Sequence, residues 1–230
     1  MKSKRFLIVF LFPFLFLSCA TLWGDRGASD RRSGVDYSHE PLRNPAVSAY
    51  VNQIARHLVQ YADREKMANP KVEVFIPKTS RIQGTSTIEG SSIEITRGML
   101  NILTNEAGLA CLLGHEIGHK VLHRNKQKYK PRNKLEEIFL PEEIARAKWN
   151  QRREGEADEY GAILCSKAGY DAYAFLNYFE RLSQFQEGGL VAALEELPST
   201  HKDFRSRAKA LRRLFIIVGD PSEESRSAEA

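Results

Sequence analysis

Two histidines four residues apart enclose a glutamate in the segment His115-Glu116-Ile117-Gly118-His119. On a helix, residues i and i+4 lie one above the other, so both imidazoles can reach one Zn²⁺ at roughly 2.0–2.1 Å. Glu116 is turned by about 100° around such a helix. It is therefore poorly placed as a third ligand, but it can take a proton from a water that the metal activates. The segment predicts the ligand pair and the general base of a hydrolytic zinc site.

The residues around this segment predict a helix at the centre of a domain. Apolar side chains cover most of its surface: Leu109, Ala110, Leu112, Leu113, Ile117, Val121 and Leu122. Unpaired histidines and a glutamate would be costly to bury in such a helix. Gly114 and Gly118 weaken a helix interior by about 1 kcal/mol each relative to alanine, which predicts close approach by another backbone. The alternative interpretation is a pair of core histidines satisfied by hydrogen bonds.

A second helix, predicted between Pro141 and Gly169, carries the candidate third ligand. Proline followed by two glutamates is typical of a helix start, and glycine is typical of a helix end. Glu154 and Asp158 lie one turn apart on this helix. Glu154 can complete a site of two histidines and one glutamate, and Asp158 can accept the outer N–H of a ligand histidine. The alternative is a solvated face that Glu154 and Asp158 share with Glu156, beside Arg152 and Arg153.

Together the two segments resemble the HtpX and CAAX-prenyl-protease family of gluzincin metallopeptidases, and specifically its soluble periplasmic lipoprotein branch with proteins such as BepA and LoiP. The resemblance runs from about residue 45 to residue 213 and includes the stretch Asn105 to Ala110 and the turn Ala168-Gly169-Tyr170-Asp171. It implies an α+β, mainly helical fold, with a gluzincin-type metallopeptidase domain and a small β-sheet beside the active-site helix. It also implies one Zn²⁺ per chain held by three ligands, a catalytic base and a supporting catalytic residue. These are His115, His119 and Glu154 as ligands, Glu116 as the base and Asp158 as the support.

Two short segments, Lys71 to Ile76 and Ser92 to Thr96, alternate apolar and polar residues and predict half-buried strands. Peptidases of this kind hold the substrate backbone against an edge strand beside the metal. We therefore predict Ile93, Glu94 and Ile95 as substrate-positioning residues on that edge, with an ordinary sheet strand as the alternative. The preceding stretch, residues 83 to 90, lacks the Asn-Ala pair that is common in the family, and we expect a loop there.

A last family feature lies near the end of the chain, where His201 and Arg207 resemble a Thr-His-Pro segment followed by an arginine. Lys202 stands here in place of the proline. The resemblance implies that His201 approaches the metal as an autoinhibitory or oxyanion-stabilising group, with helix capping or a surface position as the alternative. Arg207 is expected to position substrate or to pair with a carboxylate of the Glu154 helix. The other histidines are interpreted as ordinary surface or helix residues: His39, His57 and His123.

The amino terminus predicts export. Three basic residues precede an apolar run from Phe6 to Leu17, which is typical of a secretory signal peptide and too short to span a bilayer comfortably. Cys19 after Ser18 resembles a bacterial lipobox, which implies lipidation, with plain secretion or a retained anchor as the alternatives. We predict a signal peptide over 1–18 and a lipidated cysteine with a flexible tether over 19–40. A zinc metallopeptidase domain over 41–215 and a disordered polar tail over 216–230 follow.

Charge and cysteine content narrow the function further. Without residues 1–18 the formal net charge falls from +5 to +2, so the basic balance predicts targeting and no nucleic-acid partner. The basic stretch from Lys120 to Lys134 is expected to be a flexible lid or a solvated loop between the two metal-bearing helices. Cys111 and Cys165 lie on those helices, as two buried free thiols or as a disulfide.

These patterns predict a zinc endopeptidase of the cell envelope, a periplasm-facing lipoprotein of the outer membrane. Its expected partners are unfolded or misassembled envelope polypeptides, the membrane through the lipid anchor, and outer-membrane assembly proteins. The alternative is a lipoprotein chaperone or scaffold with a latent or inactive metal site. Retention of Glu116 favours the enzyme, because a binding module has no need of a general base.

Overall fold

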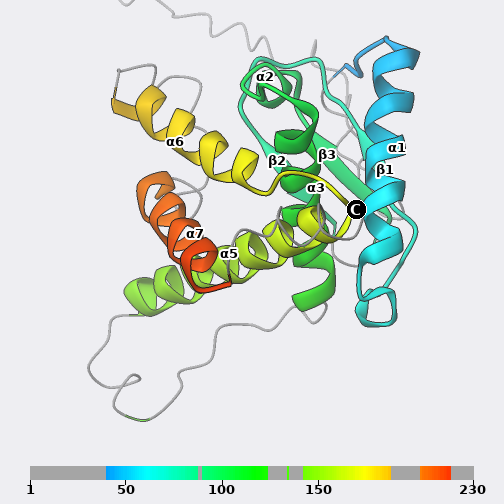
Figure 1. Cartoon of the computed structure of the whole chain (residues 1–230). Helices are drawn as coiled ribbons and strands as arrows, with labels where there is room; N and C mark the ends of the chain where they lie inside the picture. Colours follow the sequence, from blue (N-terminus) through cyan, green and yellow to red (C-terminus); the bar gives the residue numbers. More distant parts are fainter. Residues whose placement is uncertain (1–39, 88–89, 124–133, 135–141, 188–202, 219–230) are drawn as a thin grey trace, which may run out of the picture.

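Helices surround a small sheet in the computed structural model, which describes residues 40–87, 90–123, 134, 142–187 and 203–218 (Figure 1). The helices are α1 (Pro45–Tyr61), η1 (Arg64–Lys66), α2 (Arg97–Leu100), α3 (Glu106–Leu122), α5 (Glu142–Lys167), α6 (Tyr173–Glu187) and α7 (Phe204–Val218), and the strands are β1 (Glu73–Phe75), β2 (Gly84–Ser86) and β3 (Ser92–Ile95). The predicted α+β, mainly helical fold is confirmed. The predicted signal peptide, the tether with Cys19, His201 and most of the predicted tail lie outside the described residues.

β3 is the central strand of the sheet, whose order is β1-β3-β2. β1 pairs with it in parallel and β2 pairs with it in antiparallel orientation. Ile93 and Ile95 are completely buried. The prediction that Ile93, Glu94 and Ile95 form a substrate-binding edge is therefore wrong, because both sides of β3 are already hydrogen-bonded to neighbouring strands. The expected loop over residues 83 to 90 was also wrong in part, since it contains β2, which is too short to show an alternating pattern.

β2 is an edge strand of the sheet and lies against α3. Thr96 N donates to Gln83 O at 3.0 Å, and Thr87 N donates to Ser92 O at 3.0 Å. In an antiparallel ladder these bonds recur at every second residue, so the N–H and C=O groups of Gly84 and Ser86 point away from β3. Within the described part of the chain, β2 pairs with β3 alone.

α3 lies between the sheet and α5, as Figure 1 shows. Asn105 caps it by accepting a hydrogen bond from Gly108 N at 2.8 Å. Its residues are buried along nearly the whole length, which confirms the predicted central helix. Lys120, expected at the start of a lid or solvated loop, instead belongs to this helix and is completely buried.

Small residues allow α3 and α5 to cross at close range. A Cβ atom on Gly114 would lie 2.9 Å from Gly161 O, and one on Gly161 would lie 2.6 Å from His115 N. Gly118 meets Ala157 in the same way, at 3.2 Å from its carbonyl oxygen. The predicted close approach by another backbone is confirmed, and α5 supplies it.

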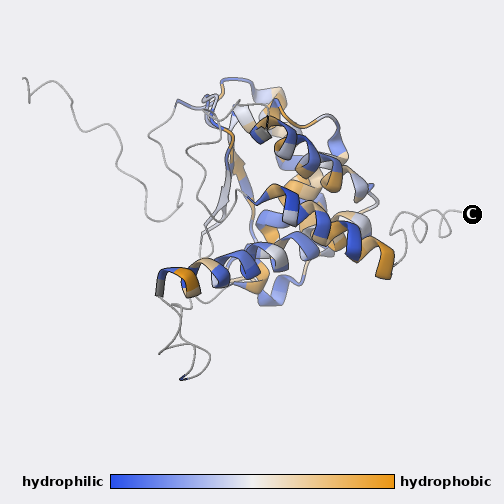
Figure 2. Cartoon of the chain, turned by 90° about the vertical axis from the view of Figure 1, so that its left-hand side faces the viewer, coloured by the Kyte–Doolittle hydropathy of each residue, from blue (hydrophilic) through white to orange (hydrophobic). Residues whose placement is uncertain are grey.

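The remaining helices enclose this pair. α1 packs through Val51, Ile54 and Leu58, and lies beside β1 and α3. The chain turns out of α5 at Gly169, whose φ of +84° favours glycine, and continues into α6. Both polar and apolar residues occur along α5 and α7 in Figure 2, as expected for helices that have one exposed and one buried face.

The last helix, α7, extends to Val218 and so continues into the range predicted as a tail. Among the described residues, the helices are too short or too polar to cross a bilayer.

Candidate metal centre

Three nitrogen and oxygen donors from α3 and α5 converge on one point. His115 Nε2 lies 3.2 Å from His119 Nε2. The carboxylate of Glu154 places Oε2 at 3.6 Å from His115 Nε2 and Oε1 at 3.5 Å from His119 Nε2. Zinc bonds of 2.0–2.1 Å in a tetrahedron put neighbouring donor atoms about 3.3 Å apart. The spacing and chemistry of this donor set therefore match a zinc ion held by His115, His119 and Glu154.

The local sequence explains how these donors meet. The two histidines share one face of α3 because they are separated by one turn. The glycine crossing brings the backbone of α5 against that of α3. The side chain of Glu154 is therefore long enough to reach the two histidines. All three side chains are mostly covered, with side-chain exposures of 3% for His115, 14% for His119 and 10% for Glu154.

Asp158 orients the first histidine. His115 Nδ1 lies 2.8 Å from Asp158 Oδ1, so the carboxylate can accept the Nδ1 proton and leave Nε2 for the metal. Arg207 holds the same carboxylate from α7, donating from Nε to Oδ2 at 2.7 Å and from Nη2 to Oδ1 at 2.6 Å. Burial acts to raise the pKa of Asp158, but the charge and hydrogen bonds of Arg207 outweigh it, and the pKa lies below its ordinary value.

Of the two roles expected for Arg207, the structure contains the ion pair. Its Nη2 also lies 3.6 Å from Glu154 Oε2, so one guanidinium faces both carboxylates of α5. The group is stacked 4.4 Å above the ring of Phe179. Its charge partners raise the pKa of Arg207 even though burial lowers it.

His123 is a residue of the site that sequence reasoning missed. It was interpreted as an ordinary surface or helix residue, yet it is only 7% exposed and its Nδ1 lies 3.0 Å from His119 Nδ1. Its Nε2 lies 3.0 Å from Glu156 Oε2. If His119 donates its Nδ1 proton to His123, His119 keeps Nε2 for a metal and His123 donates to Glu156. The repeat of histidine at residues 115, 119 and 123, one helical turn apart, was the available signal.

Glu116 stands beside the three donors and is not one of them. It is 4% exposed and lines a cavity of about 30 Å³ with Gly84, His115 and Arg207. The rest of that cavity is formed by Met99, Leu112, Tyr178 and Phe204. A Cβ atom on Gly84 would lie 3.0 Å from Glu116 Oε1, so the carboxylate rests directly against the backbone of β2.

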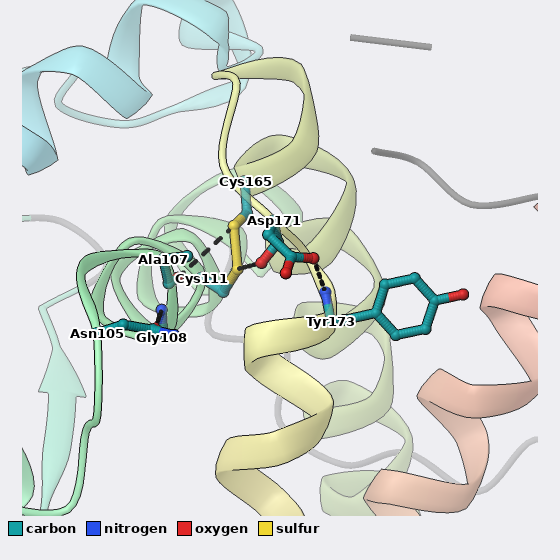
Figure 3. The surroundings of a disulfide bond; sticks show 7 residues. All are labelled: Asn105, Ala107, Gly108, Cys111, Cys165, Asp171 and Tyr173. Carbon is teal, nitrogen blue, oxygen red and sulfur yellow. Dashed lines mark hydrogen bonds between the residues drawn. A yellow bond between two sulfur atoms is a disulfide. The ribbon is translucent and has the colours of Figure 1, made fainter. Parts of the chain in front are cut away.

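A disulfide between Cys111 and Cys165 joins α3 to α5 (Figure 3). Of the two states that the sequence left open, the structure contains the bonded one. The bridge also lies near the turn after α5, where Asp171 O is 3.9 Å from Cys111 Sγ and Asp171 Oδ1 accepts from Tyr173 N at 2.9 Å. The disulfide therefore ties α3, which carries the two histidines, to α5, which carries Glu154.

Comparisons with known proteins point to the same chemistry. Residues 45–130 match the family model "Peptidase family M48", a range that includes His115, Glu116 and His119 but ends before Glu154. "Mitochondrial metalloendopeptidase OMA1" of Arabidopsis thaliana is 28% identical over 145 residues, which cover 56% of this chain and 29% of that protein. The chain thus spans less than a third of the length of this relative. The family model is thus that of a peptidase, and the relative is named as a metalloendopeptidase.

Proposed function

We propose that this chain is a zinc-dependent endopeptidase of the bacterial cell envelope that hydrolyses unfolded or misassembled proteins. The observation that carries the proposal is the position of Glu116 beside the His115, His119 and Glu154 donor set and against β2, whose outer edge has no partner strand among the described residues. A donor set alone would suit a structural metal. A carboxylate that is adjacent to the donors and free of them is what hydrolysis requires.

The residues of the site have different roles in peptide-bond hydrolysis. His115, His119 and Glu154 would hold zinc, which supplies a Lewis acid that lowers the pKa of water and polarises a carbonyl group. Glu116 takes a proton from the attacking water as its oxygen adds to the carbonyl carbon, and then delivers that proton to the departing amine nitrogen. Asp158 and His123 contact the Nδ1 atoms of His115 and His119, which would leave both Nε2 atoms for a metal.

The outer edge of β2, which pairs with no other strand in the described part of the chain, supports an extended substrate. The outward N–H and C=O groups of Gly84 and Ser86 can pair with a polypeptide backbone irrespective of its side chains. Such recognition needs a segment that is not already in secondary structure. Unfolded and misassembled proteins expose such segments, and this is the basis for the substrate class.

The cell-envelope location and the lipid anchor rest on the amino-terminal sequence. Labelled palmitate should be incorporated into the full-length chain in a bacterial host, and the Cys19→Ala variant should remain unlabelled. Equal labelling of both proteins would remove Cys19 as the anchor.

One experiment tests the enzyme directly. A chain lacking residues 1–18 and carrying Cys19→Ser is compared with its Glu116→Gln, Glu154→Ala and His201→Ala variants for zinc content and for cleavage of an unfolded protein. We expect about one zinc per chain in the parent, and Glu116→Gln should retain the metal while cleavage falls by roughly 10²–10⁴-fold. Glu154→Ala should bind zinc more weakly, and His201→Ala should cleave as well as the parent or better.

Two outcomes would overturn this proposal. Equal cleavage by the parent and Glu116→Gln would end the enzyme interpretation and favour a chaperone or scaffold with an inactive metal site. If the parent binds no zinc, the proposal of a metal centre is itself refuted.

A further inference from the structure

A buried lysine next to the metal centre is not used by the chemistry described above. Lys120 directly follows His119 in α3 and is completely buried. Its Nζ donates hydrogen bonds to Gly90 O at 2.6 Å and to Thr87 O. An apolar side chain of similar length would fill the same space without the cost of burying an ammonium group. The presence of lysine at this position therefore indicates that the two hydrogen bonds of its ammonium group have a structural role.

The two acceptors lie at the turn between β2 and β3. Thr87 closes the β2–β3 ladder, with its N–H donated to Ser92 O at 3.0 Å and its Oγ1 3.2 Å from Ser92 O. The carbonyl groups of Thr87 and Gly90 both accept a hydrogen bond from Lys120. Lys120 thus attaches the end of the hairpin to α3.

The other end of β2 is held by the active-site helix as well. Gly84 rests against the Glu116 carboxylate, with 3.0 Å from its Cβ position to Oε1. Glu116 and Lys120 are one turn apart on α3, so both ends of β2 are held by neighbouring positions of one helix. β2 is therefore fixed to α3 by the hydrogen bonds of Lys120 at one end and by packing against Glu116 at the other.

We propose that Lys120 is a positioning residue for the substrate, which holds the β2 edge in register with Glu116. The inference rests on the proposed function, because it assigns β2 as the strand with which the substrate pairs. A polypeptide that pairs with Gly84 and Ser86 presents its scissile carbonyl at a fixed place relative to the carboxylate only while the hairpin is anchored. Lys120 acts through the backbone of the hairpin and does not touch the substrate.

The Lys120→Met variant separates this role from general packing. Methionine keeps the length of the side chain and removes both donors, and Lys71→Met, before β1 with a side chain 72% exposed, provides the same substitution at the surface. The full-length chain in detergent is used, with zinc content, amide hydrogen exchange and steady-state cleavage of an unfolded protein measured for all three proteins.

The expected result has three parts. Lys120→Met retains zinc as the parent does. Amide exchange of Thr85 and Thr87, the residues of this segment whose N–H groups face β3, rises at least tenfold, while the amides in the centre of α3 keep parental rates. KM for the unfolded protein rises by several fold with a smaller change in kcat, because substrate pairing is weakened more than the chemistry that follows it. Lys71→Met matches the parent in all three measurements.

Other outcomes overturn the inference. Unchanged exchange at Thr85 and Thr87 would show that Lys120 does not anchor the hairpin. Faster exchange throughout the chain would show a purely structural role. Faster exchange at Thr85 and Thr87 with an unchanged KM would show that β2 does not carry the substrate.

The test remains informative if either the variant or the proposed function fails. If Lys120→Met does not fold, Lys120→Arg, which keeps a cationic donor, must show slower exchange at Thr85 and Thr87 than Lys120→Gln, and equal rates in the two would overturn the inference. If the parent cleaves no substrate, the proposed function fails and the assignment to substrate positioning fails with it. The exchange data would then still report on the anchor alone.

Discussion

Arg207 on α7 donates two hydrogen bonds to Asp158 on α5, at 2.7 and 2.6 Å, and Asp158 lies 2.8 Å from the Nδ1 atom of His115. A charge on the last helix therefore supports a candidate metal ligand on α3 through one carboxylate. Asp158 is buried and Arg207 is mostly covered, with side-chain exposures of 4% and 11%. The orientation of His115 thus depends on the docking of α7.

The first prediction concerns the loss of this pair. Arg207→Met keeps an apolar side chain above Phe179 and leaves the Asp158 carboxylate buried without a cation. We expect the free energy of unfolding to fall by about 3–5 kcal/mol in urea denaturation. Arg212→Met on the same helix, whose side chain is 62% exposed and pairs with Glu180, should change it by less than about 1 kcal/mol. Equal losses in the two variants would contradict a special role for the buried pair.

The same pair predicts a pH dependence in protein stripped of metal by a chelator. The pKa of Asp158 is lowered in the folded state, against about 3.9 in an unfolded chain. Its ionised form therefore stabilises the fold above about pH 4, and this contribution is lost as the pH falls through 3.9 toward the folded pKa. The stability difference between parent and Arg207→Met should narrow below about pH 4. A difference that stays constant from pH 6 to pH 3 would contradict the assignment.

The third prediction tests the glycine crossing of α3 and α5. A Cβ atom on Gly161 would lie 2.6 Å from His115 N, so Gly161→Ala must push the helices apart. We expect about 3 kcal/mol or more of lost stability and weaker zinc retention, measured by urea denaturation and by metal content. Gly155→Ala on the same helix has nothing within 4 Å and should gain up to about 1 kcal/mol from helix propensity. Similar effects of both substitutions would rule out the close contact as the cause.

The fourth prediction concerns the space between β2 and the general base. Gly84→Val places side-chain atoms where Glu116 Oε1 now rests, so the carboxylate must move. We expect kcat to fall by roughly ten- to a hundredfold with zinc content unchanged, since small misplacements of a catalytic group have effects of that size. Thr85→Val on the exposed side of β2 should keep parental kcat. Parental kcat in Gly84→Val would contradict the position of Glu116.

The fifth prediction concerns the disulfide. Cys111 and Cys165 are 54 positions apart, and closing a loop of that length is expected to stabilise the fold by about 4 kcal/mol in the chain-entropy account. Urea denaturation with and without reductant should show a loss of this order in the parent. A Cys111→Ala/Cys165→Ala double variant should be insensitive to the reductant. A parent that is equally stable in both conditions would show that the bridge is absent in solution.

The features of the site that the sequence predicted are those set within one helix. The i, i+4 spacing of His115 and His119, and the offset of Glu116, follow from helix geometry whatever surrounds the helix. Glu154 and Asp158 were proposed by the same reasoning together with a family resemblance, and the structure brings both beside the histidines. Gly114 and Gly118 predicted a close crossing, because glycine destabilises a helix interior and is usually found there where another backbone packs closely.

The features that were missed depend on which distant segments meet. Central and edge positions in a sheet are decided by strand pairing, and a three-residue strand such as β2 carries no periodic signal, so the edge position beside α3 was predicted for β3, whereas β2 occupies it. Lys120 looked like part of a solvated basic stretch because its two carbonyl partners lie in another element. His123 was passed over because burial is a property of the packed fold.

The sequence by itself determined that His115 and His119 share one helix face, that Glu116 is offset from them, and that the domain is mainly helical, since these depend on local geometry and apolar periodicity. Only the tertiary structure decided that β2 is the edge beside Glu116, that Cys111 and Cys165 are bonded, and that a mostly covered arginine supports His115 through Asp158. The physical reason is that hydrogen bonds, ion pairs and disulfides between separate elements form only after packing has brought their atoms within reach.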